Sequence, residues 1–148
     1  MADIGQTFRS MDISVSALAA QRKRLDVVAA NIANAETTRT AEGGPYKRKD
    51  ILQMAVGETG GFGEALDGAG LAKPLVAAVI EDQGAPRLVH QPGHPDADPS
   101  GMVAYPNINV VTTMTDLMSA SRLYQANVTA IETARRMSSD AMNISMRT

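Results

Sequence analysis

The sequence predicts an α+β protein in which long N- and C-terminal amphipathic helices pair as a coiled-coil-like unit around a small antiparallel, β-rich middle segment. Two observations lead to this prediction. The helix breakers are segregated, because all seven prolines and eleven of the twelve glycines lie between Gly43 and Pro106. On either side, apolar residues recur every seven positions, and a strict seven-residue repeat keeps one apolar row facing a partner helix.

The first helix is expected from about Gly5 to about Ala35. Its apolar row has a constant spacing of seven and consists of Ile4, Met11, Leu18, Leu25 and Ile32. Short polar side chains then compete with the helical hydrogen bonds and end the helix: Asn31, Asn34, Thr37 and Thr38.

The middle of the chain is expected to form short strands. Four stretches rich in Val, Ile, Leu and Tyr are separated by Pro or Gly: Tyr46 to Val56, Leu75 to Glu81, Arg87 to Gln91, and Met102 to Tyr105. The Gly-rich stretch from Val56 to Gly70 is expected to be a loop.

The last helix is expected from about Val111 to Ile144, with a capping box of Thr113 and Asp116 at its start. Its row is Val110, Leu117, Tyr124 and Ile131, again seven apart. The chain thus divides into an N-terminal helical segment (1–38), a Gly/Pro-rich β middle domain (39–106) and a C-terminal helical segment (107–148).

Composition excludes several classes of protein. A net charge of −2 gives no electrostatic reason to bind nucleic acid, and the absence of Cys excludes thiolate catalysis and Cys-ligated zinc. The longest apolar run, Leu75 to Ile80, is far shorter than the roughly 20 residues of a membrane span, so no membrane insertion is expected. Asp3 comes early and the basic triplet 22–24 follows the apolar residues, which is the reverse of a cleavable signal peptide.

Two local patterns contain residue types that occur in functional sites. The string DADPSG, from Asp96 to Gly101, matches the first half of a calcium loop, but Asn107 stands where the bidentate Glu belongs, so a rigid turn is favoured over a metal site. No nucleophile accompanies His90 or His94, so neither an enzyme nor a bound cofactor is expected.

The terminal helices are expected to need partners from outside the chain. Full burial of eight large apolar residues assigned to the stripe of the first helix contributes about 12 to 24 kcal/mol, and ordering roughly 30 backbones costs more than that. The residues expected at the interfaces are Met11, Leu18, Leu25, Asn31, Ile32, Asn34, Met114, Leu117, Tyr124, Asn127, Val128 and Ile131. The three asparagines are either helix-end or surface residues, or they form hydrogen bonds between subunits that fix the register.

The string ALAAQRKRLDVVAANIANAETT, from Ala17 to Thr38, closely resembles the signature of bacterial flagellar axial proteins, most specifically in AANIANAETT. Three more strings resemble the proximal-rod subunits of the flagellar basal body: GPYKRK (Gly44 to Lys49), HQPGHPDADPSGMVAYPNINVV (His90 to Val111) and SASRLYQANV (Ser119 to Val128).

This resemblance implies a structural subunit of a tubular rod that spans the periplasm and transmits torque, with the terminal helices toward its inner layer. It also implies export through the flagellar type III apparatus without a cleaved signal. The implied partners are copies of the chain itself, other rod subunits and the adaptor at the rod base. The residues by themselves leave one alternative, a soluble homo-oligomeric coiled-coil scaffold or secreted effector-like binding module.

Overall fold

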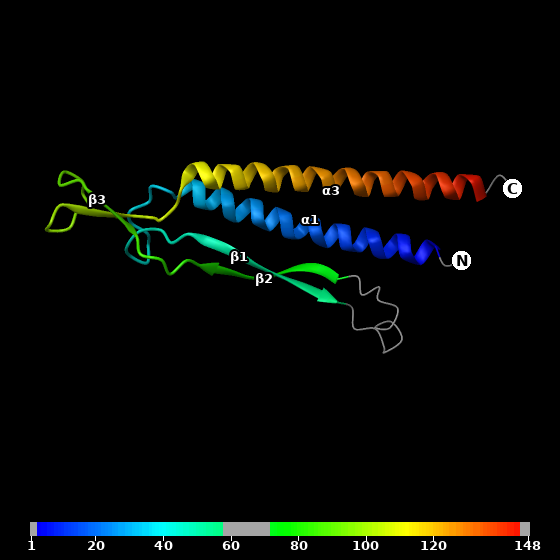
Figure 1. The fold of residues 1–148 in the computed structure, drawn as a ribbon, viewed down its shortest axis with the longest axis horizontal. Helices are drawn as coiled ribbons and strands as arrows, with labels where there is room; N and C mark the ends of the chain where they lie inside the picture. Colours follow the sequence, from blue (N-terminus) through cyan, green and yellow to red (C-terminus); the bar gives the residue numbers. More distant parts are fainter. Residues whose placement is uncertain (1–2, 58–71, 146–148) are drawn as a thin grey trace. The chain divides into compact units, whose positions relative to one another are not determined.

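The computed structural model has the predicted α+β fold and describes residues 3–57 and 72–145 (Figure 1). A long helix comes first, α1 (Asp3–Ala33), and another comes last, α3 (Val110–Ser145). The strands between them in the chain are β1 (Lys49–Gly57), β2 (Ala72–Glu81), β3 (Arg87–His90) and β4 (Met102–Tyr105). Apart from Val56 and Gly57 at the end of β1, the predicted loop of 56–70 lies outside the described residues.

The end of α1 is fixed by the short polar side chains that the sequence places there. The amide of Asn34 donates through Nδ2 to the carbonyl oxygen of Ala30 (2.9 Å), and its Oδ1 accepts the hydroxyl of Thr37 (3.2 Å). Such short-range side-chain bonds compete with the continuation of the helix. The helix therefore ends at Ala33, two residues before the predicted Ala35.

The capping box predicted at Thr113 and Asp116 is wrong, because α3 begins earlier. Asn109 is the N-cap: its Oδ1 accepts the backbone N–H of Thr112 (3.2 Å), and its carbonyl oxygen accepts that of Thr113 (2.9 Å). Asn is among the best N-cap residues for this reason. Thr113 already lies inside the first turn, where it is buried and its hydroxyl donates to the carbonyl oxygen of Asn109 (2.7 Å).

The four strands form two separate two-stranded sheets rather than one sheet. β1 pairs with β2 and β3 pairs with β4, in each case antiparallel (Figure 1). In the β3–β4 pair, Arg87 lies opposite Tyr105 and His90 lies opposite Met102. Because a lone two-stranded sheet is only marginally stable in water, each pair depends on the rest of the chain for support.

The chain divides into two compact units, and both helices contribute to both of them. The first contains Met1–Lys23, Gln53–Ala77 and Ala120–Thr148, and the second contains Arg24–Leu52 and Ala78–Ser119. Within the first unit α1 and α3 run side by side in opposite directions (Figure 1).

The buried core of the described residues is small. Its apolar members are Ala20 and Ala120 in the first unit and Val27, Ala35 and Val103 in the second. Three of the five are alanines, which bury little area each. No described helix is long and apolar enough to cross a membrane.

Candidate assembly interface and junction motif

The buried side chains of α1 are small or medium in size and lie on one line along the helix. The residues of the predicted heptad row are less buried. The buried line contains Ala20, Val27 and Asn31. Leu18 and Leu25, on the heptad row, each lie two residues from a member of that line, which is about 160° around the helix axis. Both are only partly buried, as are Met11 and Ile32 on the same row. One chain alone therefore does not enclose the heptad row.

α3 has a buried side and a separate exposed apolar strip. Thr113 and Ala120 are buried. The predicted interface residues Leu117, Tyr124, Asn127, Val128 and Ile131 are all partly buried, whereas Met114 is 52% exposed.

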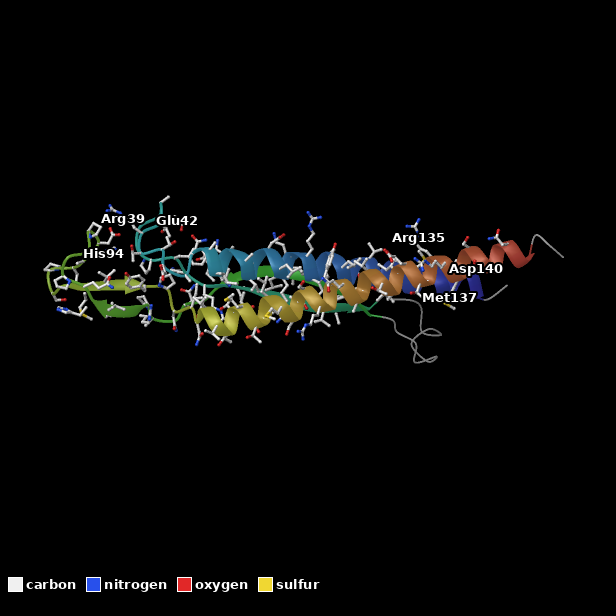
Figure 2. All side chains as sticks on the ribbon, turned by 90° about the horizontal axis from the view of Figure 1, so that it is seen from above. Arg39, Glu42, His94, Arg135, Met137 and Asp140 are labelled. Atoms are coloured by element: carbon white, nitrogen blue, oxygen red, sulfur yellow. The ribbon has the colours of Figure 1, made fainter. Side chains whose placement is uncertain are left out.

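The exposed strip continues from Met114 to residues that the sequence analysis did not place at the interfaces. Val110, Val111 and Met118 share with Met114 a sector of about 100° around the helix, and Val111 is 75% exposed. The spacing of Val111, Met114 and Met118, at three and four residues, was the signal that could have found this strip. Further along α3, in the first unit, Arg135 and Met137 project from the helix, and Met137 is also exposed (Figure 2).

The string from Asn31 to Thr38 holds loops and strands of the second unit. Asn31, 3% exposed, donates through Nδ2 to the carbonyl oxygen of Lys49 (2.7 Å), and its Oδ1 accepts the backbone N–H of Lys49 (2.9 Å). The hydroxyl of Thr38 donates to Asp96 Oδ2 (2.8 Å) in the loop between β3 and β4. We call residues 31–38 the junction motif, because they fasten both sheets to the end of α1.

The structure thus gives the first two of the three predicted asparagines different roles. Asn34 is a helix-end residue, as one of the two sequence alternatives expected. Asn31 is engaged inside its own chain over a sequence separation of 18, an arrangement that neither alternative included. Asn127 is partly buried on α3.

Tyr46 completes the site around Asn31. Its hydroxyl donates to Asn31 Oδ1 (3.1 Å). Burial, and the nearby carboxylate of Glu81, raise the pKa of the Tyr46 phenol, so the hydroxyl keeps the proton that it donates. The Lys49 ammonium lies 3.8 Å from Glu81 Oε1 and 5.9 Å from the centre of the Tyr46 ring.

The DADPSG string forms the predicted turn. Asp98 Oδ1 accepts the backbone N–H groups of Ser100 (2.8 Å) and Met102 (2.9 Å) and the hydroxyl of Ser100 (2.6 Å). These donors, with the Ser100 hydroxyl foremost, hold the pKa of the exposed Asp98 carboxyl below its ordinary value. Gly101 follows with φ +76°, a conformation that favours glycine.

Asp96 and His94 also make structural contacts around this loop. Asp96 is bound by Thr38 and lies 3.6 Å from the guanidinium of Arg39. His94, labelled with Arg39 in Figure 2, accepts the backbone N–H of Asp96 at Nδ1 (3.1 Å), and its ring meets that of Tyr105 edge-on. Among residues 3–57 and 72–145, no cluster of three or more His, Asp or Glu is placed to hold a metal ion.

The second unit contains a shallow hollow of about 260 Å³ between the 43–48 loop and the turn after β2. Lys47, Arg48, Tyr46 and three prolines line it, together with Asp82. Its lining has no histidine, serine or threonine.

These features are typical of a structural protein with exposed apolar helix surface, and comparison with known families identifies the class. Residues 11–39 match the family described as flagella basal body rod protein. Residues 100–144 match the family described as flagellar basal body rod FlgEFG protein, C-terminal. The two matches contain most of α1 and α3, respectively.

Whole-chain relatives narrow the class. The chain is 43% identical over 126 residues to the flagellar basal-body rod protein FlgC of Salmonella typhimurium, covering 85% of this chain and 88% of the relative. It is 38% identical over 150 residues to FlgC of Bacillus subtilis (93% and 97%) and 35% identical over 134 residues to FlgC of Agrobacterium fabrum (89% and 90%).

The chain belongs to the FlgC family of flagellar basal-body rod proteins. It is a structural subunit of the rod and not an enzyme, and rod subunits of this kind assemble with other rod subunits. Membership in this family replaces the alternative interpretation of the sequence, which was a soluble scaffold or secreted effector.

Proposed function

We propose that the chain assembles into the rod through the partly buried heptad row of α1 and the apolar residues of α3, against copies of itself and other rod subunits. One observation carries this proposal. Among the described residues, five apolar side chains are buried, whereas fourteen large apolar side chains are at least 40% exposed. Apolar surface on this scale is typical of proteins that bury it against a partner.

The exposed strip of α3 accounts for four of these fourteen exposed side chains. Its four side chains, Val110, Val111, Met114 and Met118, are 40 to 75% exposed. Full burial is worth about 1.5 to 3 kcal/mol for each, so enclosing the exposed half of all four would add roughly 3 to 6 kcal/mol per subunit. The heptad row of α1 adds less per residue, since its members are already partly buried. In this proposal residues 1–38 and 107–148 form the helical core of the rod, and 39–106 form the middle domain.

Photo-crosslinking in isolated basal bodies tests the proposed interface. A photoreactive phenylalanine analogue replaces Met114 in one strain and the adjacent, exposed Thr115 in another. The two positions differ by about 100° around α3. We expect adducts from position 114 whose partner, identified by mass spectrometry, is this chain or another rod subunit. Adducts from position 115 and none from 114 would contradict the proposed face.

We further propose export through the flagellar type III apparatus without cleavage, arrival in the periplasm, and contact with the adaptor at the rod base. The family membership supports this route, and so does the order of early acidic and later basic residues, which does not suit a cleavable signal. Mass spectrometry of the subunit in purified basal bodies should find its N-terminal peptide intact. Recovery of only a shortened chain would refute uncleaved export.

A further inference from the structure

The side chain of Asn31 pairs with the backbone of Lys49 as a neighbouring strand would. Its carboxamide donates to the carbonyl oxygen of Lys49 (2.7 Å) and accepts the N–H of the same residue (2.9 Å). Lys49 is the first residue of β1. The amide of a helix residue thus occupies both polar backbone groups where the strand begins.

The surroundings make this pairing difficult to replace. Asn31 is almost completely enclosed, so water does not readily take over its bonds. A buried backbone N–H or carbonyl that loses its partner destabilises the folded state by more than an average hydrogen bond stabilises it. The hydroxyl of Tyr46 makes a third bond, to the same Oδ1 atom.

The pairing of Asn31 with Lys49 lies where the hydrogen bonds between β1 and β2 begin. The neighbouring residue Arg48 accepts the backbone N–H of Asp82 at its carbonyl oxygen (2.7 Å), directly beyond the end of β2. A one-residue slip of β1 would move each of its side chains to the other face of the sheet. Fixing Lys49 therefore fixes the face on which Leu52, Met54 and Val56 lie, all of which are exposed.

We propose that Asn31 is a register lock, a positioning residue that makes the last turns of α1 and the start of the β1–β2 sheet order together. The physical reason is that each partner is weak alone: a helix end frays, and a two-stranded sheet is marginal. The proposal concerns folding within a single chain and does not depend on rod assembly.

Amide hydrogen exchange of the purified full-length chain, followed by NMR, tests the coupling from both sides. Asn31→Ala removes the carboxamide that α1 contributes to the pairing with Lys49. Lys49→Pro removes the backbone N–H of Lys49 together with its charged side chain, at a strand's first position where proline is tolerated. Lys49→Ala is the matched control, since it keeps the N–H and loses the same charged side chain. Tyr46→Phe is a mild variant that deletes one hydroxyl and keeps the ring.

The expected result is a reciprocal effect. Asn31→Ala should speed exchange in β1, and Lys49→Pro should speed it in α1 around Ala30–Asn34, each by about 30-fold or more. Tyr46→Phe should speed both regions by about three- to tenfold, and Lys49→Ala should leave α1 within about threefold of the wild type.

Three results would overturn the proposal. The first is acceleration confined to the mutated side, which would show that the helix end and the strand order independently. The second is an equal effect of Lys49→Ala and Lys49→Pro on α1. The third is a wild-type chain in which these amides have no protection at all.

Discussion

Leu25 gives the sharpest test of whether the heptad row of α1 is an assembly surface. It lies about 160° around α1 from the buried Val27 and is only partly buried in the chain. Removing a fully buried Leu side chain costs about 2 to 5 kcal/mol, so Leu25→Ala should destabilise the purified chain by only about 1 to 2 kcal/mol. Leu25→Asp adds a carboxylate that must lose water in the assembled contact, at a cost of several kcal/mol repeated in every subunit.

The assay separates folding from assembly. Each variant replaces the native protein in a motile strain, and three quantities are measured: the amount of the protein, swimming speed, and the presence of hooks and filaments by electron microscopy. Leu25→Asp should leave the amount near normal and abolish structures beyond the rod, whereas Leu25→Ala should reduce swimming. Ala19→Asp is the matched control, because it places the same carboxylate on an exposed position of α1.

Two outcomes would refute the reasoning. Normal swimming with Leu25→Asp at normal protein levels would mean that the heptad row is not enclosed in the rod. Equal loss of assembly with Ala19→Asp would mean that any added charge on α1 is harmful and that the row has no special part.

Three further predictions concern stability, measured by urea or thermal unfolding of the purified chain. Asn109→Ala should lower the free energy of unfolding by about 1 kcal/mol, because it deletes the N-cap of α3; no change would contradict the assigned cap. Asp98 has a lowered pKa in the folded chain, so its stabilisation should be present above its ordinary pKa of 3.8 and be lost as pH falls through the lowered pKa of the folded state; an Asp98→Ala deficit that does not shrink as the pH is lowered would argue against it. Gly101→Ala should destabilise the chain more than Gly43→Ala. Both glycines have positive φ, but an added Cβ would approach His90 Cε1 to 3.1 Å only at Gly101. Equal effects would show that the loop shifts to accommodate the Cβ without cost.

The periodic parts of the fold could be read directly from the sequence. α1 and α3 begin and end within two residues of their predicted bounds, and all four predicted strands are present. These features depend on neighbours a few residues apart: heptad spacing, breakers confined to the middle, and alternating apolar runs. The turn at Asp98 is equally local, since every group that it binds lies within four residues.

Pairings over long separations could not be read in this way. Nothing in the spacing of the strands says that β1–β2 and β3–β4 stay separate, because either arrangement satisfies the same local patterns. The cap of α3 was misplaced because Asn109 and Thr113 both suit the role by residue type, and only the observed start of the helix decides between them.

Asn31 shows the same division most clearly. The sequence by itself determined that a short polar side chain lies near the end of an apolar helix, which is a statement about local propensity. Only the tertiary structure decided that its amide meets the backbone of Lys49, 18 residues away, instead of water or another subunit. The reason is physical, because a carboxamide can form hydrogen bonds with any of these partners. The bond forms with the partner that the fold brings within reach and shields from solvent.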